Sequence, residues 1–127
     1  LRVIGKLKMS DKYLINCQQG NDDLEKATVA MIVAGAASAM NSETAMFLTC
    51  EAVTMAKKGA ADGMQAEGYP AMSDLMEAYF ENEGKLWVCP VCAAAHGITE
   101  DDLVEGAEIA GAARTIGFVS DGAKILM

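Results

Sequence analysis

Short apolar runs alternate with helix-forming segments along nearly the whole chain, and this alternation constrains the fold more than any other feature. The runs are rich in strand-forming residues and cover 13–17, 44–50, 86–88, 107–110 and 123–127. Apolar residues at helical spacing, or residues typical of helix starts, mark 22–40, 51–58, 71–82, 90–96, 100–105 and 112–120. Strands that alternate with helices form parallel sheets covered by helices. We therefore predict a small, doubly wound α/β fold with a mainly parallel five-stranded sheet and helices on both faces.

The length of the chain sets the number of domains. Its 127 residues suffice for one domain with a substantial core and are too few for two. We assign residues 12–127 to this single domain. We expect residues 1–11 to be an N-terminal extension, because Met9-Ser10-Asp11 resembles a natural start. The eight residues before Met9 would then be a vector remnant or an extended reading of the gene start.

The acidic composition limits the kinds of partner. The formal net charge is −8 and the pI is about 4.5, whereas a nucleic-acid-binding protein needs a basic face. The longest apolar stretch, 27–40, falls short of the roughly 20 residues that span a bilayer. The N-terminus lacks the apolar centre and cleavage site of a signal peptide. We therefore expect a cytoplasmic protein that binds neither nucleic acid nor membrane, with its cysteines reduced.

The strongest candidate for chemistry is Cys89, which stands where a predicted strand ends and a predicted helix begins. Pro90 at the first helical position and Gly97 just past the last one bound that helix. The free N–H groups at a helix start carry partial positive charge and favour a thiolate over a thiol. Cys92 lies one turn further and can share a face with Cys89. We predict Cys89 as a nucleophile and Cys92 as the second candidate catalytic residue.

Two further cysteines fall at predicted strand ends. Cys17 and Cys50 each close an apolar run, as Cys89 does. Ligands bind and chemistry occurs at the carboxyl edge of open α/β sheets, so three of the four thiols could face one edge. Small buried side chains are the plainer interpretation of Cys17 and Cys50.

Metal and cofactor sites are weaker hypotheses. Cys89, Cys92 and His96 supply three ligands, whereas structural zinc takes four, and a histidine at a helix end is typically solvated. A haem attachment motif needs His directly after the second Cys, where Ala93 stands. The loop 18–23 has one glycine and two acids, which disfavours phosphate or flavin. We expect no metal and no cofactor.

A dithiol site of the thioredoxin type is the serious alternative from the residues alone. Two cysteines separated by two residues at a helix start are its usual arrangement. The surrounding strand–helix series is a continuous doubly wound one, unlike that of thioredoxin. Both interpretations remain open at this point.

The chain also resembles a known family. The matching segments are 86–89 with 97–98, the turn 99–102, the strand 106–111 and the closing strand 121–127. These resemble the DsrE/DsrF-like proteins, which include the sulfur-relay subunits of the Tus system and of dissimilatory sulfur oxidation. The resemblance covers residues 12–127. It implies a flavodoxin-like fold, a homo-oligomer of like subunits, and a persulfide on Cys89; Cys92 is not part of the relay subunits' pattern.

Together these observations predict a sulfur-transfer protein that holds sulfur as a persulfide on Cys89. Its partners would be a sulfur-donor protein and a sulfur-acceptor protein. The first alternative is a dithiol–disulfide oxidoreductase that uses Cys89 and Cys92. The second alternative is a non-catalytic oligomeric binding module whose thiols are incidental.

Overall fold

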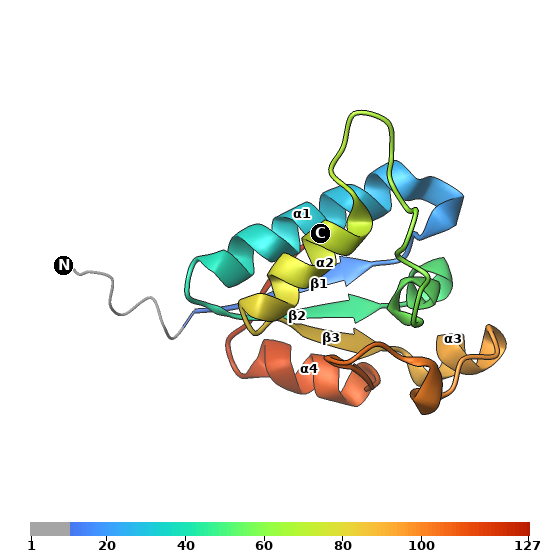
Figure 1. Cartoon of the computed structure of the whole chain (residues 1–127). Helices are drawn as coiled ribbons and strands as arrows, with labels where there is room; N and C mark the ends of the chain where they lie inside the picture. The colour runs from blue at the N-terminus through green and yellow to red at the C-terminus, as the bar shows by residue number, and fades with distance from the viewer. Residues whose placement is uncertain (1–10) are drawn as a thin grey trace.

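The computed structural model describes residues 11–127 and contains one five-stranded sheet (Figure 1). Every strand pair is parallel, and the strand order is β4-β3-β2-β1-β5. The strands are β1 (Lys12–Cys17), β2 (Glu43–Leu48), β3 (Lys85–Val88), β4 (Ala107–Ile109) and β5 (Lys124–Leu126). The predicted extension 1–11 lies outside the described residues except for Asp11. The predicted doubly wound, flavodoxin-like α/β fold is confirmed.

Helices cover both faces of the sheet. Figure 1 shows α1 (Leu24–Ala39) and α2 (Met72–Glu81) on one face and α4 (Ala112–Ser120) on the other. The short helix α3 (Pro90–Ala95) lies beyond the carboxyl ends of the strands. Residues 11–127 also contain three 3₁₀ segments: η2 (Asn21–Asp23), η3 (Cys50–Ala56) and η4 (Glu100–Asp102). Within the described residues, no helix is both long and apolar enough to cross a membrane.

Neighbouring residues of the three central strands, β1, β2 and β3, are buried on opposite faces, which gives two cores. On the face of α1 and α2, Ile15 and Met46 pack against the alanine-rich side of α1. The small side chains of α1 let the helix lie close to the strands. On the α4 face, Trp87 packs edge-on against Phe118, with ring centroids 5.3 Å apart. Burial on both faces explains why the strands read as apolar runs without alternation.

The start of α1 differs from the predicted capping box of Asp22 and Glu25. Asp23 is the N-cap, and its carboxylate accepts the Lys26 N–H at 3.2 Å. Asp22 instead accepts the Gly20 N–H at 2.8 Å, in the turn that precedes η2. The carboxylate of Asp22 therefore bonds within the 3₁₀ turn rather than capping α1. The helix begins two residues later than predicted.

The two segments predicted as short α-helices at 51–58 and 100–105 are 3₁₀ segments. η3 ends where Lys57 becomes extended and forms an isolated antiparallel bridge with Leu103. The Lys58 N–H donates to the Asp102 carbonyl at 2.8 Å beside that bridge. The carboxylate of Asp102 closes a capping box with Thr99. The bonds between the ends of η3 and η4 thus take the place of the bonds that would extend η3 into an α-helix.

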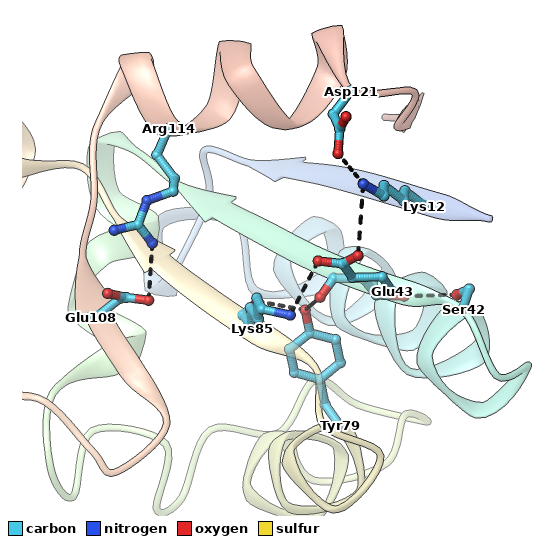
Figure 2. Close-up of polar contacts among 9 residues, drawn as sticks. Lys12, Ser42, Glu43, Tyr79, Lys85, Glu108, Arg114 and Asp121 are labelled. Atoms are coloured by element: carbon cyan, nitrogen blue, oxygen red, sulfur yellow. Dashed lines mark hydrogen bonds and ion pairs between the residues drawn. The ribbon is translucent and has the colours of Figure 1, made fainter. Parts of the chain in front are cut away.

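Exposed ion pairs link the amino ends of the strands (Figure 2). Glu43 on β2 lies 3.9 Å from the Lys12 ammonium on β1 and 3.4 Å from that of Lys85 on β3. Lys12 also pairs with Asp121, just after α4. Each such pair adds little stability in water. The pairs lie across three neighbouring strands, at the edge of the sheet opposite α3.

Tyr79 anchors α2 to the sheet at that same edge. Its side chain is fully buried, and its hydroxyl donates to the Lys85 carbonyl at 2.6 Å (Figure 2). Burial raises the pKa of this phenol far above its usual range, so the hydroxyl stays a donor. The ring packs against Gly84, where a Cβ would come within 2.3 Å of ring carbons.

The close approach of Gly84 and Tyr79 predicts the effect of one methyl group. Gly84→Ala forces the buried ring to move, and we expect a loss of about 1–3 kcal/mol of unfolding free energy. Gly35→Ala is the matched control, because a Cβ there meets no atom within 4 Å. Alanine inside α1 should raise stability by roughly 0.5–1 kcal/mol. Urea denaturation measures both, and an unchanged midpoint for Gly84→Ala would contradict the packing described here.

Candidate functional site

Cys89 occupies the predicted joint between strand and helix. It follows β3 directly and is the N-cap of α3. Its N–H donates to the Leu48 carbonyl at 3.0 Å, which extends the pairing of β2 and β3 by one residue. Its own carbonyl accepts the Ala93 N–H at 2.8 Å as the first bond of α3. Both backbone groups of Cys89 are therefore fixed, while its side chain is half-buried at the carboxyl edge of the sheet.

The thiol of Cys92 lies against the backbone of Cys50. The Cys50 N–H donates to the Cys92 sulfur at 3.1 Å. Cys50 is the second residue after β2 and the first of η3, and its φ is +54°. This left-handed conformation is rare for a residue with a side chain, and such strain clusters at functional sites. In this protein the residue with the left-handed conformation, Cys50, is the one whose amide donates to the Cys92 sulfur on α3.

The environment of Cys92 changes its acidity. The Cys50 amide has the largest single influence and favours the thiolate. Partial burial and the neighbouring Cys89 and Cys50 side chains act in the opposite direction, and together they raise the pKa of Cys92. Cys92 therefore keeps its proton to a higher pH than an ordinary thiol. Cys50, Cys89 and Cys92 thus lie near one another where η3 meets α3, and we call these three residues the three-thiol cluster.

His96 borders the three-thiol cluster. It follows α3, one turn beyond Cys92, and its Nε2 lies 3.9 Å from the Glu51 carboxylate. We predicted a solvated histidine at a helix end, and the side chain is partly exposed beside this carboxylate. Among residues 11–127, no group of three or more His, Cys, Asp or Glu side chains is arranged to hold a metal ion.

Cys17 does not join the cluster. It is the last residue of β1, its side chain is buried in the core under α1, and its thiol donates to the Gln19 carbonyl at 3.3 Å. Burial raises the pKa of Cys17, which makes it a poor nucleophile. The difference from Cys50 follows from position: a residue within a strand alternates into the core, whereas Cys50 lies past the end of β2, where the chain turns.

A cavity of about 710 Å³ lies at the same edge of the sheet, beside the ends of β1 and β2. Amide side chains, Phe47 and Thr49 contribute to its wall, and no cysteine lines it. No pattern of residues predicted this cavity or the contact between Cys50 and Cys92. The first depends on how loops meet, and the second on a backbone conformation that sequence patterns do not assign to cysteine.

Comparison with known proteins gives the relatives of this chain. The family model described as "DsrE/DsrF-like family" matches residues 11–127. The uncharacterized protein MJ0760 of Methanocaldococcus jannaschii is 32% identical over 113 residues, which are 89% of this chain and 41% of that protein. The chain thus spans about two fifths of that relative's length. The uncharacterized protein MK0008 of Methanopyrus kandleri is 26% identical over 102 residues, 80% of this chain and 81% of that protein.

Two solved structures share the fold. The ychN protein from E. coli superposes with a TM-score of 0.66 at 19% identity, covering 93% of this chain and 97% of that one. MTH1491 from Methanobacterium thermoautotrophicum, a protein of unknown function, gives a TM-score of 0.64 at 12% identity, covering 92% and 97%. At these identities the likeness concerns the fold alone. The family match, which runs from the start of β1 to the last residue, carries the assignment: this chain belongs to the DsrE/DsrF-like family.

Proposed function

We propose that this protein is a sulfur carrier that holds sulfur as a persulfide on Cys89. The Cys89 thiolate attacks the outer sulfur of a donor persulfide, forms a new S–S bond and releases the donor thiolate. The resulting Cys89–S–SH then gives its outer sulfur to an acceptor thiolate, and Cys89 leaves as the thiolate. No net oxidation occurs in either step. A donor protein and an acceptor protein are the partners that this cycle requires.

The observation that carries the proposal is the position of Cys89 in a DsrE/DsrF-like chain. The family includes sulfur-relay subunits, and by the resemblance in sequence Cys89 would correspond to the cysteine that carries sulfur in them. Its half-buried side chain at the carboxyl edge of the sheet suits the role, because the sulfur must be both protected from solvent and reachable by a second thiol.

A dithiol oxidoreductase is the second candidate, and one observation favours it. Cys92 lies one helical turn beyond Cys89, and the Cys89 side chain is near enough to influence the pKa of Cys92, so a disulfide between them is within reach. The raised pKa of Cys92 argues for the carrier instead, since a protonated neighbour attacks a persulfide slowly. A binding module with incidental thiols is the remaining alternative.

Two single substitutions separate these functions. Cys89→Ser should abolish loading from a small persulfide donor, because the receiving sulfur is gone. Cys92→Ser should load normally and keep its persulfide roughly tenfold longer or more, because the neighbouring thiol that could release the sulfur is absent. Intact-mass spectrometry before and after loading detects the added sulfur atom.

The control for this experiment is Cys17→Ala, which removes a buried thiol outside the three-thiol cluster and should behave like the unmodified protein. All variants should also be assayed for reduction of a model protein disulfide. Turnover that stops in Cys92→Ser, with no persulfide ever trapped on Cys89, would replace the carrier with the oxidoreductase. No sulfur uptake and no turnover would leave the binding module.

The raised pKa of Cys92 predicts how pH affects the stored sulfur. Below that pKa, the thiolate fraction of Cys92 grows by roughly tenfold per pH unit, so the attack on Cys89–S–SH accelerates as pH rises. We expect the persulfide lifetime to shorten from pH 6 to 9 in the unmodified protein and to depend much less on pH in Cys92→Ser. Equal pH profiles for the two proteins would show that Cys92 does not attack the persulfide.

We also propose that the protein is a homo-oligomer. Ile116 on α4 and Ile125 on β5 are 64% and 56% exposed, and both line an apolar cavity of about 370 Å³ that also reaches Phe47. Exposed apolar surface of this kind is typical of an interface, and the family resemblance points to contacts between like subunits. A second copy of the chain is the occupant we propose.

Light scattering at micromolar concentration should give a mass of at least two chains. Ile116→Glu should shift the mass toward one chain, because it buries a charge in the proposed interface. Met40→Glu is the matched control, since Met40 is 72% exposed at the end of α1 and lies outside that cavity. A single-chain mass for the unmodified protein would refute the proposal.

A further inference from the structure

Cys50 is a third thiol at the site, and the carrier mechanism does not use it. It is exposed, whereas Cys89 and Cys92 are half-buried. Its N–H donates to the Cys92 sulfur at 3.1 Å, and its φ of +54° holds the amide in that direction. No other cysteine of the described residues makes a backbone contact to a thiol of α3. The position of Cys50 therefore requires an explanation of its own.

A second contact fixes Cys50 in place. Glu51, the next residue, faces His96, which lies one helical turn beyond Cys92. Two successive residues of η3 thus meet Cys92 on α3 and His96 just after it. Both contacts lie on the same side of α3 and are consistent with the position of Cys50 beside Cys92.

The contact between Cys50 and Cys92 is short enough for a disulfide. With N···Sγ at 3.1 Å, standard bond lengths place the two Cα atoms no more than about 7.5 Å apart, and this limit includes the range of about 4.4–6.8 Å that disulfides span. Formation of the bond requires the Cys50 side chain to turn toward Cys92. Cys89 lies one turn before Cys92 and is its other neighbour, so Cys92 has two possible disulfide partners.

We propose that Cys50 is the resolving thiol of this site: it takes Cys92 out of a Cys89–Cys92 disulfide and returns Cys89 to its free form. This inference rests on the proposed sulfur-carrier function. It adds a fate for the stored sulfur, release as sulfide, and a means of restoring Cys89 afterwards.

The first step releases sulfide. Cys92 attacks the inner sulfur of Cys89–S–SH, a Cys89–Cys92 bond forms, the persulfide bond breaks, and hydrosulfide leaves with the proton from Cys92. The two electrons that reduce the outer sulfur come from the two cysteines, which become a disulfide. No external oxidant or reductant is needed for this step.

The second step frees Cys89. The Cys50 thiolate attacks the Cys92 sulfur, a Cys50–Cys92 bond forms, the Cys89–Cys92 bond breaks, and Cys89 leaves as a thiolate. No electrons are gained or lost overall. Because Cys50 is exposed, two molecules of a small thiol can then reduce the Cys50–Cys92 disulfide and leave as their own disulfide.

Oxidation by glutathione disulfide tests the pairing independently of any sulfur transfer. Cleavage after Lys and Arg places Cys50 on residues 27–57 and places Cys89 and Cys92 together on residues 86–114. A Cys50–Cys92 disulfide therefore links two peptides, whereas a Cys89–Cys92 disulfide stays within one. We expect the linked pair, with fragment ions between Cys89 and Cys92 assigning the bond to Cys92. A final product with Cys89–Cys92, or with Cys50 unlinked, would overturn the proposal.

Reloading without added reductant tests the resolving step. The unmodified protein should release one sulfide per chain and then accept a second sulfur on Cys89. Cys50→Ser should release the first sulfide but stop as Cys89–Cys92, and its second loading should fall by about tenfold or more. Cys50→Asn serves as a second variant, because Asn tolerates positive φ and also lacks the thiol.

Cys17→Ala is the control and should reload like the unmodified protein. Reloading of both Cys50 variants at the unmodified level would overturn the resolving role while leaving the carrier function intact. Absence of any persulfide on Cys89 would instead refute the carrier function. In that case the glutathione experiment alone decides whether Cys50 and Cys92 form the redox pair of the site.

Discussion

The parallel pairing of β2 and β3 is the constraint on which the site depends. It continues one residue past β3, through the hydrogen bond from the Cys89 amide to the Leu48 carbonyl. Because the two strands run in the same direction, the segments that follow them leave the sheet side by side. One segment carries Cys50 and the other carries Cys89 and Cys92, so residues far apart in sequence meet at one edge. An antiparallel pair would have sent the two segments to opposite ends of the sheet.

The sequence was sufficient to predict the fold because the three central strands are buried on both faces. Leu14 and Ile15 lie on opposite sides of β1 and are both buried. The result is a continuous apolar run, which is typical of a parallel strand covered on both faces. The position of Cys89 was predictable as well, since Pro90 marks a helix start by its fixed φ and missing N–H. The boundaries of η3 were not, because bonds to the distant segment around Asp102 end that helix.

The arrangement of the cysteines was only partly predictable. Equal position at strand ends suggested that Cys17 and Cys50 were alike, but side-chain alternation buries Cys17 and leaves Cys50 beyond the strand. The positive φ of Cys50 has no sequence signal, because glycine and asparagine usually occupy that conformation. It is a product of the whole fold. The role of Cys89 is a prediction supported by its position and by family membership, and the role of Cys92 is a prediction supported by its position alone.

A carrier that keeps a second thiol beside its persulfide must control when that thiol reacts. The two influences on Cys92 provide such control in opposite directions. The charges of Cys89 and Cys50, together with partial burial, favour the protonated thiol, which preserves the persulfide. The Cys50 amide favours the thiolate and stabilises Cys92 as it reacts. The amide donor belongs to the backbone and is present whether or not Cys89 carries sulfur. The backbone of Cys50 therefore holds Cys92 in place in both states of Cys89.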